Sequence, residues 1–118
     1  MADELTVTAG LSYVNTGVSM SFTGTDKVTI AANFALRSLI TVTVAGMALP
    51  LGGVTTPGYV LIKNTDTTNY VVVGNSGDTL PIQIKAGELA LFRWAAGITP
   101  YVISNGGNVV IDYMLISV

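Results

Sequence analysis

The 118-residue sequence contains neither cysteine nor histidine. The missing cysteine excludes disulfide bonds, thiolate nucleophiles and thiolate metal ligands. The missing histidine removes the usual general base near neutral pH, the commonest metal ligand and the partner of most serine nucleophiles. We therefore expect a protein that is not an enzyme and has no catalytic residues, no cofactor and no metal site.

Charged residues are also scarce, at 10% of the chain, and the net charge is −2. The five cations are scattered along the sequence, so they form no basic patch that could follow a phosphate backbone. We therefore expect no nucleic-acid partner.

Long hydrophobic runs are absent as well. The longest nearly apolar stretch, residues 45–54, is too short to span a membrane and contains Pro50, Gly52 and Gly53. The first four residues include Asp3 and Glu4 and show none of the features of a secretion signal. The sequence predicts synthesis in the cytoplasm and no membrane partner.

Hydrophobic residues nevertheless make up 50% of the chain. This proportion, combined with so little charge, is unusual for a soluble monomer that has to stay apart from its neighbours. We expect other protein chains to cover part of the surface, in a homo-oligomer.

Alternation of apolar residues with Thr and Ser predicts β-strands along almost the whole chain. The length suits one domain, so we expect residues 1–118 to form a single all-β domain of two packed antiparallel sheets, with or without a short extended N-terminal arm. A short helical turn over residues 33–39 is the one alternative to strand. The expected strands are Leu5–Thr8, Val18–Phe22, Lys27–Ala32, Leu39–Val44, Tyr59–Lys63, Tyr70–Val73, Leu80–Ile84, Glu88–Trp94, Tyr101–Ile103 and Val109–Val118.

Several acidic and amide side chains lie in turns rich in Thr, Asn and Gly. Asp and Asn are standard turn residues, which favours structural roles over acid–base catalysis or calcium binding. Their spacing also differs from that of an EF-hand loop. The carboxylates considered are Asp66, Asp78, Glu88 and Asp112, and the calcium-ligand candidates are Asn64, Asp66, Asn69, Asn75 and Asp78.

The expected strand Val109–Val118 is apolar on both faces, and Asp112 is its one charged residue. Such a strand is buried inside a larger stack of sheets or at a subunit contact. The connection over residues 47–54 is also more apolar than a solvated loop. We therefore place a subunit or partner interface in these two regions and at further tyrosines and apolar residues. The candidate residues are Val7, Met47, Leu49, Leu51, Tyr59, Tyr101, Tyr113 and Met114.

Two segments, Gly58–Val71 and Pro81–Arg93, resemble small β-rich structural proteins of tailed bacteriophages. The shared pattern is a strand that ends in Lys-Asn, a Thr/Asn turn into a Tyr-Val strand, and a Lys-Ala-Gly-Glu entry to an apolar strand. The resemblance implies a virion protein of the capsid decoration or cement type, with a jelly-roll-like sandwich. It also implies a homotrimer that binds the major capsid protein on the capsid exterior.

Two alternatives to this function remain open. The segment before Gly58 carries no such pattern, so a tail, neck or head-fibre protein is one alternative. A carbohydrate-binding, lectin-like module is the other, in which Tyr59, Trp94 or Tyr101 would stack on a sugar ring. Trp94 ends an alternating apolar run, however, which favours a place in the core.

Overall fold

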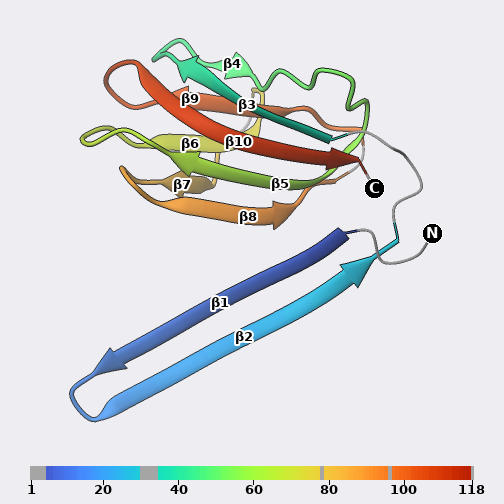
Figure 1. The fold of residues 1–118 in the computed structure, drawn as a ribbon. Helices are drawn as coiled ribbons and strands as arrows, with labels where there is room; N and C mark the ends of the chain where they lie inside the picture. The colour runs from blue at the N-terminus through green and yellow to red at the C-terminus, as the bar shows by residue number, and fades with distance from the viewer. Residues whose placement is uncertain (1–4, 30–34, 78, 96, 118) are drawn as a thin grey trace. The chain divides into compact units, whose positions relative to one another are not determined.

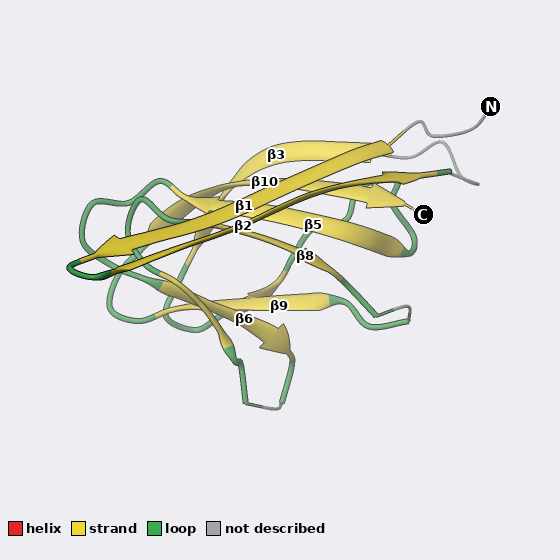
Figure 2. Cartoon of the chain, turned by 90° about the horizontal axis from the view of Figure 1, so that it is seen from below, coloured by secondary structure: helices red, strands yellow, loops and turns green. Residues whose placement is uncertain are grey.

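The computed structural model describes residues 5–29, 35–77, 79–95 and 97–117, and these residues form ten strands and no helix (Figures 1 and 2). Every strand pairing in it is antiparallel. The all-β, antiparallel prediction is therefore confirmed. The helical turn is wrong for the part that is described, because a strand begins at Ala35, while Asn33 and Phe34 lie outside the described residues.

The chain divides into two compact units, with the boundary between Ala32 and Asn33. We expected a single domain, but the first two strands pair only with each other. Strands β1 (Leu5–Asn15) and β2 (Val18–Val28) form a long hairpin, in register from Leu5↔Val28 to Asn15↔Val18. Gly17 closes the two-residue turn with a φ of +77°, a conformation that glycine adopts without steric cost.

The second unit contains eight strands in two four-stranded sheets, with the orders β3-β10-β5-β8 and β4-β9-β6-β7. The strands are β3 (Ala35–Val42), β4 (Met47–Ala48), β5 (Pro57–Asn64), β6 (Val71–Asn75), β7 (Ile82–Ile84), β8 (Leu89–Arg93), β9 (Pro100–Ser104) and β10 (Val109–Ser117).

The pairing of these eight strands follows a mirror rule. The first strand pairs with the last, the second with the last but one, and so on inward: β3 with β10, β4 with β9, β5 with β8, and β6 with β7. Two further pairings, β10 with β5 and β9 with β6, complete the sheets. Within this unit the chain thus forms a series of nested antiparallel strand pairs.

Side chains from both sheets contribute to one hydrophobic core in this unit. Strand β10 shows the pattern most clearly, because Val109, Ile111, Tyr113 and Leu115 are all buried while the residues between them are more exposed. Burial raises the pKa of the Tyr113 hydroxyl, which donates a hydrogen bond of 2.7 Å to the carbonyl oxygen of Pro50. The remaining buried apolar residues are Val42, Leu49, Val54, Val60, Ile62, Val71, Val73, Ile84 and Val102.

The apolar connection over residues 47–54 belongs to this core. Leu49 and Val54 are 1% exposed, and Leu51 packs against the core from its margin. A hydrogen bond of 2.8 Å from the Leu49 N–H to the carbonyl oxygen of Pro100 fixes the segment beside β9. The low polarity of this loop therefore reflects burial within the chain itself.

Candidate interaction surfaces

The hairpin has two chemically different faces. Because side chains alternate along a strand, the register places almost all of the large apolar residues on one face. We call this the hairpin apolar face, and it consists of Leu5, Val7, Ala9, Leu11, Tyr13, Asn15, Val18, Met20, Phe22, Gly24, Asp26 and Val28. The opposite face, the hairpin hydroxyl face, consists of Thr6, Thr8, Gly10, Ser12, Val14, Ser19, Ser21, Thr23, Thr25 and Lys27.

The hairpin apolar face is unusually exposed. Phe22 is 79% exposed and its cross-strand partner Leu11 is 77% exposed, and Met20 beside them is 66% exposed. Asp26 is the only charged residue on this face. On the other face, the hydroxyl oxygens of Thr8 and Thr25 lie 3.4 Å apart, as expected for polar cross-strand neighbours. A large apolar area next to water is typical of a protein-interaction surface.

A second exposed surface lies on the sheet β3-β10-β5-β8, on the side away from the core. We call it the outer sheet face. Leu39 is 64% exposed and Leu89 is 62% exposed. Between them the sheet has a shallow depression of about 180 Å³, lined by Arg37, Leu61, Lys63, Leu89, Asp112, Tyr113 and Met114.

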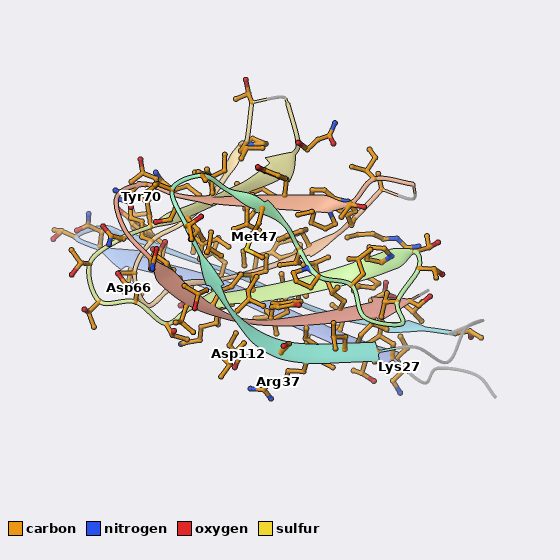
Figure 3. All side chains as sticks on the ribbon, turned by 90° about the horizontal axis from the view of Figure 1, so that it is seen from above. Lys27, Arg37, Met47, Asp66, Tyr70 and Asp112 are labelled. Carbon is orange, nitrogen blue, oxygen red and sulfur yellow. The ribbon has the colours of Figure 1, made fainter. Side chains whose placement is uncertain are left out.

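An ion pair crosses this outer sheet face (Figure 3). The Arg37 guanidinium donates two hydrogen bonds to the Asp112 carboxylate, at 3.2 and 2.9 Å. These hydrogen bonds lower the pKa of Asp112, and the same carboxylate raises the pKa of Arg37. Further along the sheet, the Arg93 guanidinium lies 5.2 Å from the centre of the Tyr59 ring. The face therefore combines apolar side chains with one ion pair and one guanidinium group held over an aromatic ring.

The predicted interface residues are distributed over several places. Val7 lies on the hairpin apolar face, and Met114 and Tyr59 lie on the outer sheet face. Leu49 and Tyr113 are each 1% exposed in the core, so they offer no surface to a partner in this conformation. They were predicted as interface residues because apolar positions that face the core and those that face a partner look alike in a sequence.

The other three predicted residues, Met47, Leu51 and Tyr101, are half-buried around strands β4 and β9. The Tyr101 hydroxyl donates a 3.4 Å hydrogen bond to the carbonyl oxygen of Ala45. Only glycine fits at position 46 beside Tyr101. A Cβ on residue 46 would come within 2.8 Å of the Tyr101 ring, and the φ of Gly46 is +80°. This region is a well-packed edge of the unit.

Sequence reasoning missed several strongly exposed apolar residues, which are Leu11, Val14, Met20 and Phe22 on the hairpin and Leu39 and Leu89 on the outer sheet face. The sequence holds a signal for the pairing of Leu11 with Phe22, though not for their exposure. Leu11 and Phe22 lie at equal distances from the Thr16-Gly17 turn, so a hairpin closed there makes them direct neighbours.

The calcium-ligand candidates around Asn64 serve the turn itself. The buried Asn64 amide donates to the carbonyl oxygens of Asn69 and Ile84, at 2.9 and 3.0 Å, and its oxygen accepts the Asp66 N–H. Asp66 accepts the N–H groups of Asn69 and Thr68, and these bonds lower its pKa. Asp78 lies outside the described residues, and within those residues no three acidic side chains come together as a metal site would need.

Trp94 packs against the core, as the sequence favoured. Its indole N–H donates a hydrogen bond of 2.6 Å to the carbonyl oxygen of Ile98, and its ring lies 5.7 Å from that of Phe92. The exposed edge of Trp94 borders an open depression of about 380 Å³, together with Asn75, Thr79 and Arg93.

No protein-family model matches the chain, and no curated protein or solved structure is significantly similar to it. In the described part of the chain there is no helix long and apolar enough to cross a membrane.

Proposed function

We propose that the chain is a non-enzymatic structural protein of a tailed-bacteriophage virion, of the capsid decoration or cement type. In this proposal it forms a homotrimer, binds the major capsid protein on the capsid exterior and is made in the host cytoplasm. The observation that carries the proposal is the exposure of two apolar β-faces, the hairpin apolar face and the outer sheet face. Exposed apolar surface of this extent is suited to protein contacts.

The strand order supports a jelly-roll sandwich as the fold behind this function. A jelly roll has eight strands in two sheets. Its strand order arises when a ribbon of four antiparallel strand pairs folds over on itself, and the pairing of the eight strands β3 to β10 follows this order. Jelly rolls are frequent in viral capsid proteins and in lectins. Strands β5 and β8, which pair with each other, come from the two segments that resemble phage structural proteins, Gly58–Val71 and Pro81–Arg93. This resemblance favours a viral protein over a lectin.

The outer sheet face is the better candidate for the capsid contact. Leu39, Leu89 and Met114 can bury apolar area, while the Arg37–Asp112 pair and Lys63 give orientation through charge. Because a capsid presents many identical sites, three linked copies gain avidity even when each contact is weak. The contact requires no cofactor, membrane or nucleic acid.

Co-sedimentation tests this function. The purified chain is mixed with capsids assembled from the major capsid protein of the same genome, and the wild type is expected to sediment with them. Leu39→Lys should reduce the bound fraction at least tenfold, whereas Gln83→Lys, at an exposed position on the other sheet, should not. Absence of wild-type binding to the capsids would contradict the decoration role and leave the tail, neck or head-fibre alternatives.

A carbohydrate-binding module is the second candidate, and the depression beside Trp94 favours it. Asn75, Thr79 and Arg93 could supply hydrogen bonds to a sugar there. The Trp94 indole, however, is already engaged by Ile98 and Phe92. Binding to a glycan array that disappears in Thr79→Tyr, without binding to capsids, would favour this candidate.

A further inference from the structure

We propose that the β1–β2 hairpins of several copies of this chain join edge to edge in one closed antiparallel ring. In this ring, strand β1 of one copy pairs with strand β2 of the next, the hairpin apolar faces point inward, and the hairpin hydroxyl faces point to water. The inference deepens the homo-oligomeric part of the proposed function and does not depend on the capsid contact.

The first argument is that the hairpin cannot be stable by itself. An isolated two-stranded hairpin is marginally stable at best in water, and stability requires further strands or a packed apolar face. Each of these strands is 11 residues long, and Leu11, Met20 and Phe22 lie open to solvent on the hairpin apolar face. Additional protein must therefore cover this face when the hairpin is fully formed.

The second argument concerns the edges of the hairpin. Proteins protect exposed edge strands with charges, prolines, bulges or short strands. Strand β1 contains no proline and no charged residue, and its pairing with β2 runs through the full length without a register shift. Strand β2 carries charge only at Asp26 and Lys27, near one end. Both outer edges are thus long, regular and suited to pairing with another strand.

The third argument compares a closed ring with a face-to-face dimer. From strand dimensions, the hairpin apolar face measures about 37 Å by about 10 Å, a footprint of about 370 Å². Two hairpins stacked face to face would meet only over this footprint, which is small for an interface that typically buries roughly 800 Å² of accessible surface per partner. They would also leave every outer edge unpaired. A ring covers the same face and pairs both edges of each hairpin, as closed barrels do.

The side chains on the two faces of the hairpin are compatible with a ring of identical copies. Bulky side chains near the turn, from Leu11, Tyr13, Met20 and Phe22, can fill the inside of a ring, and the Ser and Thr hydroxyls opposite them remain in water. Asp26, the one charge on the inward face, lies opposite Val7 near the open end of the hairpin, where a carboxylate can reach solvent. Cyclic symmetry makes every contact the same, so the ring closes without free edges.

The test uses the full chain and two neighbouring substitutions that add the same charge to opposite faces. Light scattering should give one discrete closed oligomer, expected at three times the 12.2 kDa of a chain, for the wild type and for Ser21→Lys. Phe22→Lys should reduce the mass to that of a single chain. Fluorescence of Trp94, which lies in the second unit, checks that this unit remains folded in each variant. Leu11→Ser serves as a second face variant if Phe22→Lys does not fold.

Amide hydrogen exchange over residues 5–28 separates a ring from other assemblies. A ring should protect the amides of both strands in the wild type and in Ser21→Lys, and this protection should fall at least tenfold in Phe22→Lys. The proposal is overturned by a wild-type monomer, by loss of the oligomer in Ser21→Lys, or by a dimer whose outward-facing amides exchange rapidly. A ring that forms but does not bind capsids would support this inference while contradicting the capsid contact.

Discussion

The hairpin and the region Ala35–Ser117 have the same alternation of apolar and hydroxyl side chains, yet only the second encloses a core. On strand β10, the apolar positions Ile111 and Leu115 are completely buried in the hydrophobic core. On strands β1 and β2, the equivalent alternation leaves Leu11 and Phe22 in water. Alternation thus indicates which residues share a face, but whether that face is covered depends on tertiary or quaternary partners.

The largest difference in the free energy of unfolding is expected between substitutions of a buried and of an exposed apolar residue. Ile111→Ala should lower the free energy of unfolding of the second unit by about 2–5 kcal/mol, because it removes packing from a filled core. Leu11→Ala should leave that free energy unchanged, because Leu11 belongs to the other unit. Urea unfolding followed by Trp94 fluorescence measures both. Equal destabilisation by the two substitutions would show that the hairpin and the core unfold as one.

The next largest effect on the free energy of unfolding is expected at Asn64, whose buried side-chain amide lies in the second unit. Asn64→Ala removes the hydrogen bonds to the carbonyl oxygens of Asn69 and Ile84, and should cost about 1–3 kcal/mol for the loss of buried hydrogen bonds. Asn108→Ala, at an exposed position, is the control and should have little effect. The same urea titration gives both values, and similar midpoints for the two variants would argue against a structural role of the Asn64 amide.

A smaller effect is expected from the Asp66 carboxylate. Backbone N–H groups of Asn69 and Thr68 lower its pKa in the folded state. Its charged form therefore stabilises the fold above the unfolded pKa, about 3.9, and this contribution disappears as the pH falls through the lower folded value. Asp66→Asn should lower the Tm at pH 7, and the difference from the wild type should shrink toward about pH 2. A difference in Tm that is constant with pH would contradict this explanation.

The smallest effect should come from the Arg37–Asp112 ion pair. Arg37 is 72% exposed, and ion pairs in water contribute little to stability because solvent screens them and the side chains lose freedom. Arg37→Gln should therefore leave the Tm close to that of the wild type, while it weakens any capsid contact made through the outer sheet face. A large drop in Tm would mean that this face is packed against another part of the assembly.

The sequence was sufficient to predict the all-β class and the antiparallel strands, and it grouped Val109, Ile111, Tyr113 and Leu115 on one face of β10 without showing that this face is the buried one. It divided β2 into two strands, although the structure continues through Gly24, which lies opposite Ala9. It also placed Leu49 and Tyr113 at an interface, because a buried position and a partner-facing position have the same apolar composition. Neither the division into two units nor the exposure of Leu11 could be derived, since both depend on which strands pair over long distances.

The measurement that tests the central claim most directly is the solution mass of the wild-type chain by light scattering over a wide range of concentration. If the hairpin apolar face is covered by other copies, the protein should show a single mass that is a whole multiple of 12.2 kDa, expected to be three, and that persists on dilution. A mass of 12.2 kDa at every concentration would contradict the claim, because the exposed face of the hairpin would then have no partner in the chain's own assembly.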